Sequence, residues 1–320
     1  MQPARPRLGS ALAQYPRLRA ALHGHIMKYM RFAVCLLLLG FGVLGVVLAQ
    51  GTGVVQPQDS KVYVCPMDPD VRASKEGVCS RCGMKLVAGL PDPVEYQLDL
   101  AITPRKLAPA QKANLDFVVR DPWKNLPVTS FQVVHEKLFH LFVVSQDLQF
   151  FVHDHPRLED GGNFVYDIAF PKSGMYRILG DFYPDGATPQ LIAKTVIVAG
   201  PPPAPVKLQR DYSAKNAENM QVSLTSDPPQ PLVGQKTQIY FRLNPSDGLE
   251  KLLGAWAHML VGSDDLIDLI HTHPIIADGG PQVQFSLVFP RPRTYRIWVQ
   301  FQRKGVVNTV HFDVPVSELQ

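Results

Sequence analysis

The sequence predicts a mainly β protein in which two similar sandwich domains follow a small cysteine-rich segment. The first observation is an internal repeat: Gln97–Phe117 resembles Gln221–Phe241, and Tyr176-Arg-Ile recurs as Tyr295-Arg-Ile. The second is the pattern within each copy, where short runs rich in β-branched and aromatic residues are separated by turn residues. Neither copy shows a long helical period, so we expect both to consist of strands.

Each copy has the length and strand rhythm of an immunoglobulin-like β-sandwich. A period this long indicates duplicated domains and not a solenoid. The stretch Gly200-Pro-Pro-Pro-Ala-Pro205 is a stiff, extended spacer between the copies. We therefore expect seven parts: a basic extension (1–31), a signal peptide or membrane-anchor helix (32–49), a tether (50–60), a cysteine knuckle (61–90), repeat 1 (95–199), a linker (200–206) and repeat 2 (207–316).

The N-terminal region predicts export from the cytoplasm. Phe32–Ala49 is an uncharged apolar run preceded by Lys28 and Arg31, typical of a signal peptide and just long enough for an uncleaved membrane anchor. The chain carries 32 basic and 28 acidic residues, but residues 1–50 contain no acid. The remainder is close to neutral, which argues against nucleic acid as a partner. We expect a periplasmic or extracytoplasmic protein of a bacterial cell envelope, secreted or anchored by one N-terminal segment.

Three cysteines follow the apolar run, in Cys65-Pro-Met67-Asp68 and Cys79-Ser-Arg-Cys82-Gly83-Met84. An odd number of cysteines in an oxidising compartment argues against a simple disulfide framework. Thiolates with methionines nearby are soft donors, which suit Cu(I) or Zn(II). Gly83 allows the backbone to turn and to direct amides at the sulfurs. The alternative is a purely structural zinc knuckle or a Cys79–Cys82 disulfide.

This stretch resembles the heavy-metal-binding domain of copper and heavy-metal efflux components. The match consists of Tyr63, Cys65, Pro66, Met67, Pro69, Gly77, Cys79, Cys82, Gly83, Met84 and Leu86. Three positions depart from the family pattern: Asp68 stands where the family has histidine, and Glu76 and Ser80 each replace a proline. The resemblance implies a copper or zinc site in which either three sulfurs suffice or Asp68 adds an oxygen. The candidate ligands are Cys65, Met67, Asp68, Cys79, Cys82 and Met84.

A histidine hairpin is predicted in each repeat. In repeat 1, a turn centred between positions 146 and 147 would place His140 directly opposite His153, and His155 would share their face of the sheet. The same reasoning in repeat 2, with the turn centred between positions 264 and 265, groups His258, His271 and His273. Each hairpin is therefore expected to gather three imidazoles, enough to hold one Cu(II) or Zn(II) ion.

Neighbouring residues bear on these hairpins. We expect Met259 to add a soft donor beside His258, and His135 to point away from His140 on the opposite face of a regular strand. The alternative is that duplication alone preserves the pattern and that His-x-His-Pro merely ends a strand. The two repeats resemble a group of bacterial envelope domains called YtkA-like, which resemble copper-handling modules. That resemblance carries over to the three histidines and the following proline of each hairpin.

Together these patterns predict an exported, envelope-tethered protein that captures copper, or zinc, and hands it to an efflux system or another metal-handling protein. The membrane is a partner if the N-terminal segment is uncleaved. No catalytic residue or enzymatic activity is expected, because no nucleophile elbow, phosphate loop or His-Glu-x-x-His occurs. Two alternatives remain: a structural or interaction module with one zinc knuckle, and a cupin-like metal-dependent oxidoreductase using His153, His155 and Glu159.

Overall fold

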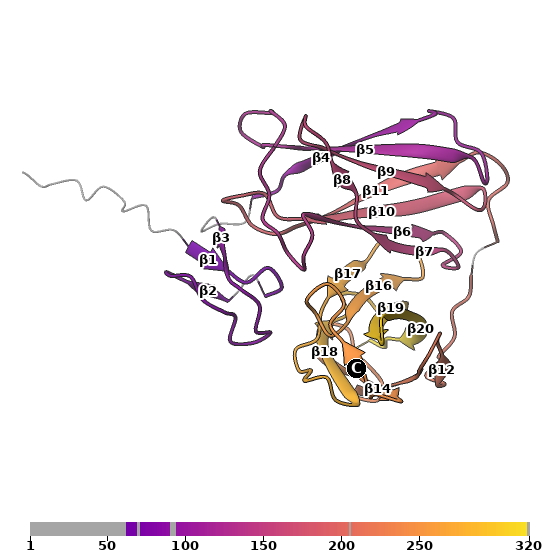
Figure 1. Ribbon diagram of the computed structural model, residues 1–320. Helices are drawn as coiled ribbons and strands as arrows, with labels where there is room; N and C mark the ends of the chain where they lie inside the picture. The colour runs from indigo at the N-terminus through magenta and orange to yellow at the C-terminus, as the bar shows by residue number, and fades with distance from the viewer. Residues whose placement is uncertain (1–61, 69–70, 90–93, 205, 319–320) are drawn as a thin grey trace, which may run out of the picture. The chain divides into compact units, whose positions relative to one another are not determined.

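Strands account for all regular structure in the residues that the computed structural model describes, which are 62–68, 71–89, 94–204 and 206–318 (Figure 1). All of these residues belong to a single structural unit, Asp59–Gln320. Within them, no helix is long and apolar enough to cross a membrane. The apolar signal or anchor predicted at 32–49 lies outside the described residues. The prediction of a mainly β protein is confirmed.

A three-stranded antiparallel sheet with the order β2–β1–β3 forms the knuckle. Its strands are β1 (Val62–Val64), β2 (Arg72–Ala73) and β3 (Val87–Gly89). The buried centre consists of Cys65, Cys79 and Leu86, so two thiols occupy the place that apolar side chains take in a larger domain. Gly83 has a φ of 75°, which lets its N–H reach the Cys79 carbonyl at 2.9 Å and closes the loop.

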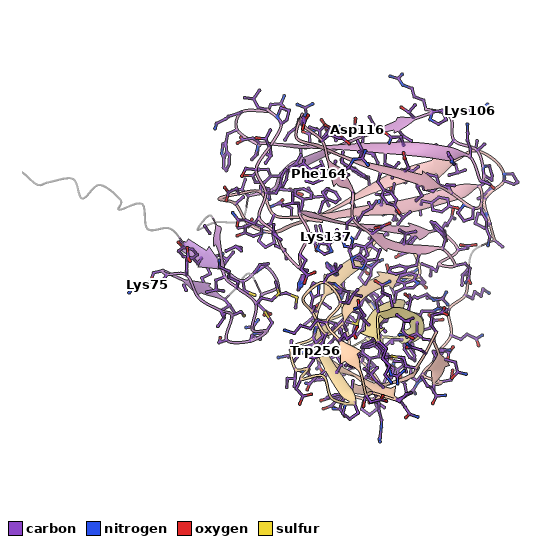
Figure 2. The ribbon with its side chains drawn as sticks, viewed as in Figure 1. Lys75, Lys106, Asp116, Lys137, Phe164 and Trp256 are labelled. Atoms are coloured by element: carbon purple, nitrogen blue, oxygen red, sulfur yellow. The ribbon has the colours of Figure 1, made fainter. Side chains whose placement is uncertain are left out.

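Repeat 1 is a sandwich of two four-stranded antiparallel sheets (Figure 1). One has the order β4 (Gln97–Thr103), β5 (Lys112–Arg120), β9 (Asn163–Ala169), β8 (Arg157–Leu158). The other has the order β11 (Gln190–Val198), β10 (Gly174–Phe182), β6 (Phe139–Ser145), β7 (Phe151–Asp154). Alternate residues of β5 are buried, as the period of two predicts. Phe164 of β9 is buried in the core between the sheets (Figure 2).

Repeat 2 has the same plan. One sheet has the order β12 (Lys215–Asn216), β13 (Gln221–Asp227), β14 (Lys236–Asn244), β18 (Gln282–Val288). The other has the order β15 (Leu249–Glu250), β19 (Thr294–Arg303), β16 (His258–Ser263), β17 (Leu269–Thr272), and β20 (Val306–Pro315) pairs with β19. The two repeats divide their main strands between the sheets in the same way. In repeat 1, one sheet contains β4, β5 and β9, and the other contains β6, β7, β10 and β11. In repeat 2, one sheet contains β13, β14 and β18, and the other contains β16, β17, β19 and β20.

This strand layout is that of an immunoglobulin-like sandwich, as predicted. A further mark of these sandwiches is a tyrosine whose hydroxyl bonds to the backbone a few residues upstream. Tyr176 donates to the Lys172 carbonyl at 2.8 Å, and Tyr295 donates to the Arg291 carbonyl at 3.0 Å. The repeated Tyr-Arg-Ile of the sequence therefore has a structural role in both copies.

The strands β6 and β16 are buried along their whole length because each packs on both faces. Leu141 and Val143 face the core of repeat 1, whereas Phe142 belongs to a second apolar cluster that also contains Leu260 and Trp298 of repeat 2. His140 precedes Phe142 by two residues and so shares its face of the strand. The histidine-bearing face of each hairpin is therefore the face that meets the other repeat.

Both hairpin turns are centred one residue later than predicted. Phe142 pairs with His153, and Leu260 pairs with His271, so neither predicted histidine pair is directly opposed. The cause is a longer loop, in which Leu148 adopts a φ of 56° and Ser145 Oγ accepts the Phe150 N–H at 2.9 Å. Because the pairing shifts by two positions, the histidines stay on the predicted face.

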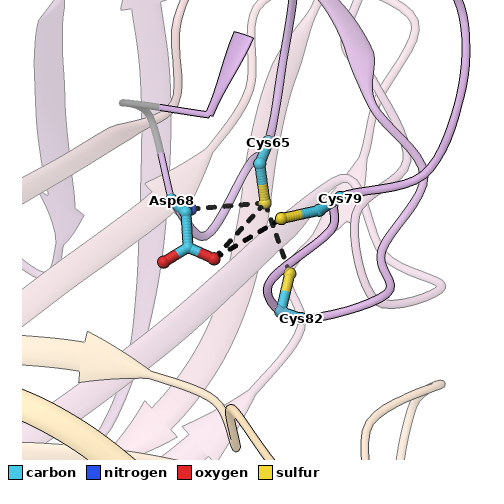
Figure 3. Close-up of side chains that lie close together, drawn as sticks. All are labelled: Cys65, Asp68, Cys79 and Cys82. Carbon is cyan, nitrogen blue, oxygen red and sulfur yellow. Dashed lines mark hydrogen bonds between the residues drawn. The ribbon is translucent and has the colours of Figure 1, made fainter. Parts of the chain in front are cut away.

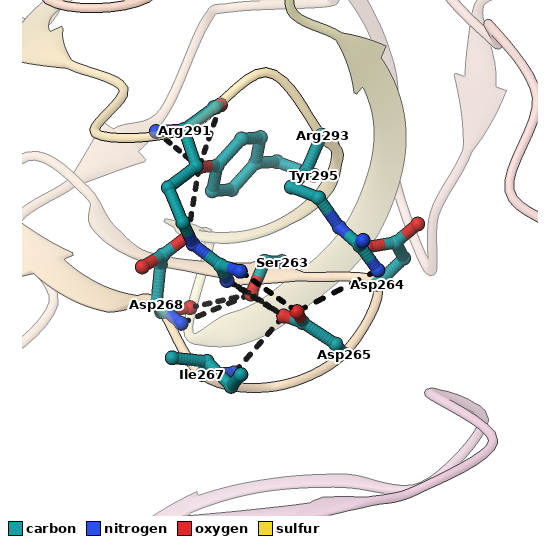
Figure 4. A network of polar contacts seen from close by, with 8 residues as sticks. All are labelled: Ser263, Asp264, Asp265, Ile267, Asp268, Arg291, Arg293 and Tyr295. Carbon is teal, nitrogen blue, oxygen red and sulfur yellow. Dashed lines mark hydrogen bonds and ion pairs between the residues drawn. The ribbon is translucent and has the colours of Figure 1, made fainter.

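Arg291 fixes the hairpin turn of repeat 2 (Figure 4). Its guanidinium donates to both carboxylate oxygens of Asp265, at 2.9 and 2.8 Å, and to Asp268 at 2.8 Å. The bonds from Arg291 hold the pKa of Asp265 well below its ordinary value. In repeat 1 the corresponding cation is Lys172, whose ammonium donates to Asp147 at 2.8 Å. The second turn is thus held by the more extensive network.

Replacing Arg291 with methionine is expected to lower the free energy of unfolding by about 1–2 kcal/mol, because two carboxylates lose a charge-assisted partner at a partly exposed site. Urea denaturation followed by tryptophan fluorescence measures the loss. Lys172→Met is the matched control, and it should cause a smaller change because it removes one bond from a single carboxylate and the lysine side chain is 57% exposed. If both variants lose the same free energy of unfolding, the contact of Arg291 with both oxygens of Asp265 adds no stability beyond a single ion pair.

Candidate metal centres

The knuckle brings four predicted ligands together (Figure 3). Cys65, Asp68, Cys79 and Cys82 each place one ligand atom within 4.8 Å of the others. The sulfurs of Cys65 and Cys82 are 3.3 Å apart, and Asp68 Oδ2 lies 3.6 Å from the Cys79 sulfur. Around a tetrahedral zinc ion with Zn–S bonds of about 2.3 Å, neighbouring sulfurs are about 3.8 Å apart. The four donors therefore enclose a space of the size of such an ion.

Two backbone amides point at sulfurs of the knuckle. The amide of Asp68 points at the Cys65 sulfur at 3.3 Å, and the amide of Arg81 points at the Cys79 sulfur at 3.4 Å. The Arg81 guanidinium also pairs with the second oxygen of Asp68, at 2.8 Å. Sulfur-directed amides were predicted for this loop, and they come from Asp68 and Arg81.

All three thiols are free, so the alternative Cys79–Cys82 disulfide is not formed. The hydrogen bond with Cys65, together with burial, raises the pKa of Cys82 far above its ordinary value. Two thiols this close resist ionising together because two adjacent negative sulfurs repel each other. A bound cation removes that repulsion, so this arrangement suits a metal ion better than it suits free thiolates.

The two predicted methionine ligands have other contacts. Met67 places its sulfur against Nδ1 of His273 in repeat 2. Met84 accepts the Cys79 N–H through its backbone carbonyl at 2.7 Å. Ligation of a metal ion through these two methionine sulfurs stays a prediction. Asp68, the departure from the family pattern, has its carboxylate among the thiols.

The three hairpin histidines of repeat 1 form a group, here called group A. His140, His153 and His155 bring one ring nitrogen each to within 4.8 Å of the others. Nδ1 of His140 lies 3.2 Å from Nε2 of His153 and 3.2 Å from Nε2 of His155. The predicted set is therefore assembled, although through the shifted strand pairing.

A second group, here called group B, differs from the predicted set of repeat 2. It consists of His135, His258 and His273, so it contains one histidine of repeat 1. Nε2 of His273 lies 2.9 Å from Nδ1 of His258, and the ring of His135 stacks on that of His273 with centroids 3.7 Å apart. His271 remains adjacent, with its ring centroid 4.5 Å from that of His273.

The prediction that His135 points to the opposite face from His140 was wrong, because the chain does not form a regular strand there. Val134 and Lys137 exchange two backbone hydrogen bonds across a tight turn in which His135 and Glu136 have φ values of 48° and 63°. The aligned turn of repeat 2 has Leu253-Gly254 at these positions. Its glycine, typical of such a turn, was the signal in the sequence that could have identified the turn.

Burial keeps these rings neutral. It lowers the pKa of His135 to about 3 and the pKa of His155 to about 4. The same cause holds the pKa values of His153, His258 and His273 well below the ordinary value. Neutral imidazole is the form that binds metal ions, so the lone pairs of both groups are available at neutral pH.

Two other residues considered as metal ligands, Met259 and Glu159, lie outside the histidine groups. Met259 is fully buried in the core of repeat 2, because neighbouring residues of a strand point to opposite faces, so it is not a donor beside His258. Glu159, which the cupin-like alternative requires, pairs with Arg157 at 2.7 Å and is not part of group A. The group therefore consists of imidazoles without that carboxylate.

The fold and the thiol cluster define the class of this protein: a heavy-metal-binding knuckle joined to two immunoglobulin-like domains. Residues 62–88 match the family described as heavy metal binding domain, which confirms the resemblance seen in the cysteine motif. Residues 93–199 and 215–318 each match the family described as domain of unknown function, DUF8832. These two matches cover most of the chain, and the protein belongs to the DUF8832 family.

Solved structures with similar folds include two bacterial adhesins. Yersinia pseudotuberculosis adhesin InvE is 12% identical over 69% of this chain and 60% of its own, with a TM-score of 0.23. The Escherichia coli adhesin FdeC is 14% identical over 73% of this chain and 68% of its own, with a TM-score of 0.25. The fibronectin(III)-like modules of Clostridium thermocellum CbhA are 11% identical over 69% and 95%, with a TM-score of 0.20. No curated protein matches the chain.

Proposed function

We propose that this protein captures copper outside the cytoplasm in the knuckle and passes it to another metal-handling protein. The observation that carries the proposal is the group of three free thiols and one carboxylate whose ligand atoms lie within 4.8 Å of one another. Thiolates are the ligands preferred by Cu(I) and are also common around Zn(II). The three sulfurs alone suffice for Cu(I), the proposed cargo, and the carboxylate of Asp68 as a fourth donor makes Zn(II) the competing ion.

An extracytoplasmic location is part of the proposal. It rests on the basic and then apolar N-terminal sequence that ends near Ala49. In an oxidising compartment, the three free thiols of the knuckle would need a bound metal ion to keep them from pairing. The proposed location therefore requires that the knuckle is loaded with metal.

Release to a partner requires access to the bound ion. Cys65 and Cys79 are buried, whereas Cys82 is only partly buried. Cys82 also borders a groove of about 960 Å³, together with Met84 and Lys85 of the same loop. A partner thiolate that enters this groove would reach Cys82 first, and ligand exchange would begin there.

The test is a titration of the full chain with Cu(I) under reducing conditions, followed by alkylation and mass spectrometry. One equivalent of Cu(I) is expected to protect three cysteines from alkylation. Cys35→Ser, which changes the one cysteine within the apolar run, is the control and should leave the three protected thiols unchanged. Reaction of all three at an unchanged rate in the presence of Cu(I) would exclude the knuckle as the copper site.

A structural zinc knuckle is the second candidate, and one observation favours it: the thiols form the centre of the knuckle's own small core. In that case zinc would be held permanently, because such small modules depend on their metal to fold. The two functions predict different rates of metal exchange. Cu(I) transfers to a competing thiol chelator within the time of mixing if the knuckle is a carrier, whereas a structural zinc ion stays until the knuckle unfolds.

A further inference from the structure

Seven histidines from both repeats lie together where the hairpins meet, although the knuckle site does not involve them as ligands. Groups A and B are neighbours: the rings of His140 and His258 have centroids 6.0 Å apart, and those of His153 and His258 are 5.2 Å apart. A lone histidine on a strand is usually a hydrogen-bonded structural residue. Two sets of three converging rings, drawn from two domains, need a different explanation.

The outward nitrogens of these rings are already occupied by acceptors. Nε2 of His140 lies 3.0 Å from the Val134 carbonyl, and Nε2 of His258 lies 2.9 Å from the Leu252 carbonyl. In His273, Nδ1 faces the Met67 sulfur. When one ring nitrogen donates its proton to such an acceptor, the other carries the lone pair, which is how metal-binding histidines are normally held. The lone pairs of these rings therefore point into the two groups.

Two of the acceptors cross from one repeat to the other. His153 of repeat 1 lies 2.6 Å from Gln300 of repeat 2, and His271 of repeat 2 lies 2.5 Å from Asp181 of repeat 1. Asp181 pairs with His140 along the sheet, and Gln300 pairs with His258 in the same way. The two residues thus occupy corresponding positions, and each orients a histidine of the opposite repeat.

Two buried imidazole nitrogens are unpaired among the residues that the structure describes. Nε2 of His135 and Nε2 of His271 are both buried without a hydrogen-bond partner. Both residues line a cavity of about 50 Å³, which they share with His140, His273 and Met67. Native proteins rarely leave buried polar atoms unpaired unless water or an ion completes them. The cavity exceeds the roughly 10–15 Å³ that a single water requires.

The backbone of His135 adds a second sign of function. His135 and Glu136 are the two central residues of their turn, and both have a positive φ. Residues other than glycine adopt this backbone conformation at an energetic cost. The equivalent turn in repeat 2 has glycine at one of these positions. Strain of this kind persists where the strained residue has a use. The use visible here is the placement of the His135 ring on His273.

We infer that the two repeats jointly form a paired metal centre for copper or zinc ions, with one ion in group A and one in group B. Group B takes His135 from repeat 1 and His258 and His273 from repeat 2. Gln300 of repeat 2 is a positioning residue, because it orients His153 of group A across the junction. Imidazole suits both copper and zinc. This inference extends the proposed function from the knuckle to the repeats, but it does not depend on the thiols.

The test uses the full chain with all four cysteines replaced by serine (Cys35, Cys65, Cys79 and Cys82), so that no thiol can bind the metal. Cu(II) is added in excess, weakly bound metal is removed, and bound metal is counted by elemental mass spectrometry. Two ions per chain are expected, with nitrogen hyperfine structure in the electron paramagnetic resonance spectrum. Dipolar coupling between the two ions is also expected, because the groups are adjacent. Fewer than two ions, or two uncoupled ions, would overturn the paired centre.

Single substitutions in the same chain locate the ions. His135→Ala is expected to remove one ion and the coupling, whereas His311→Ala, on β20 outside both groups, should remove neither. Gln300→Leu should weaken copper binding about 10- to 100-fold, the usual effect of losing a residue that orients a ligand. Gln302→Leu, two residues along the same strand, is its control. A His135→Ala chain that keeps two coupled ions would refute the cross-repeat group B.

The wild-type chain provides a measurement that does not depend on how well the variants fold. Excess Zn(II) is expected to give three ions per chain, one in the knuckle and two in the paired centre. If the knuckle proposal fails and the paired centre stands, the wild-type and cysteine-free chains both bind two ions. One ion in the wild type and none in the cysteine-free chain would leave the knuckle alone as a metal site.

Discussion

A chain carrying Cys79→Ser is expected to bind Cu(I) or Zn(II) at the knuckle about 100- to 1000-fold more weakly than the wild type. Structural zinc sites with four ligands bind with about 10–16 kcal/mol, so one ligand accounts for roughly 2.5–4 kcal/mol. Cys79 is only 2% exposed, so water has little access to take the place of its sulfur. Competition with a chromophoric chelator measures the affinity.

Two neighbouring substitutions sharpen the interpretation of that result. Ser80→Ala changes an exposed residue beside Cys79 and should keep the affinity of the wild type. Asp68→Asn should weaken Zn(II) more than Cu(I), because only the tetrahedral ion needs the fourth, oxygen ligand. An unchanged affinity in the Cys79→Ser chain would mean that the thiols do not hold the metal.

Replacing Arg296 with methionine is expected to lower the free energy of unfolding by about 3–5 kcal/mol, the usual effect of breaking a buried ion pair from one side. Arg296 and Asp313 are each 6% exposed, and the guanidinium contacts the two carboxylate oxygens at 2.7 and 2.8 Å. It also donates to the Leu148 carbonyl of repeat 1 at 3.0 Å. Without Arg296, the Asp313 carboxylate is buried without its counter-ion. Denaturant unfolding followed by circular dichroism measures the loss.

Arg293 is the matched control because it forms a similar pair with Asp264 while its side chain is 40% exposed. Arg293→Met should cost about 1 kcal/mol or less, as expected for a solvent-screened pair. The double change Arg296→Met with Asp313→Leu removes both charges and should recover most of the loss. If Arg296→Met lowers the free energy of unfolding no more than Arg293→Met does, the buried pair is not a major stabilising contact.

The fold was predictable because two kinds of periodicity coincide in the sequence. Alternation within each strand specifies which side chains face the core, and the duplicated segments specify that this core is built twice. The turns were harder. Leu148 and Leu266 adopt positive φ values of 56° and 53°, which leucine seldom does, so the sequence contained no turn residue at these positions to set the register.

The knuckle ligands were predictable because all four lie within a short stretch with a dense motif. The composition of group B was not, because it depends on which faces of two separate domains meet. His135, Asp181 and Gln300 act across that junction, and no spacing along the chain brings them together. Met259 could have been excluded from the alternation of the strand alone, since the residue beside an inward-facing histidine must face the opposite side.

The crossed contacts of Asp181 and Gln300 also bear on how this protein is divided into modules. Immunoglobulin-like domains are usually exchangeable, because each completes its own core and is joined to the next by a linker. A repeat taken from this chain alone would retain its hairpin histidines but lose the acceptor that orients one of them. If the two repeats form one paired metal centre, they are two halves of one unit, and deletion or exchange of either half is expected to disable both.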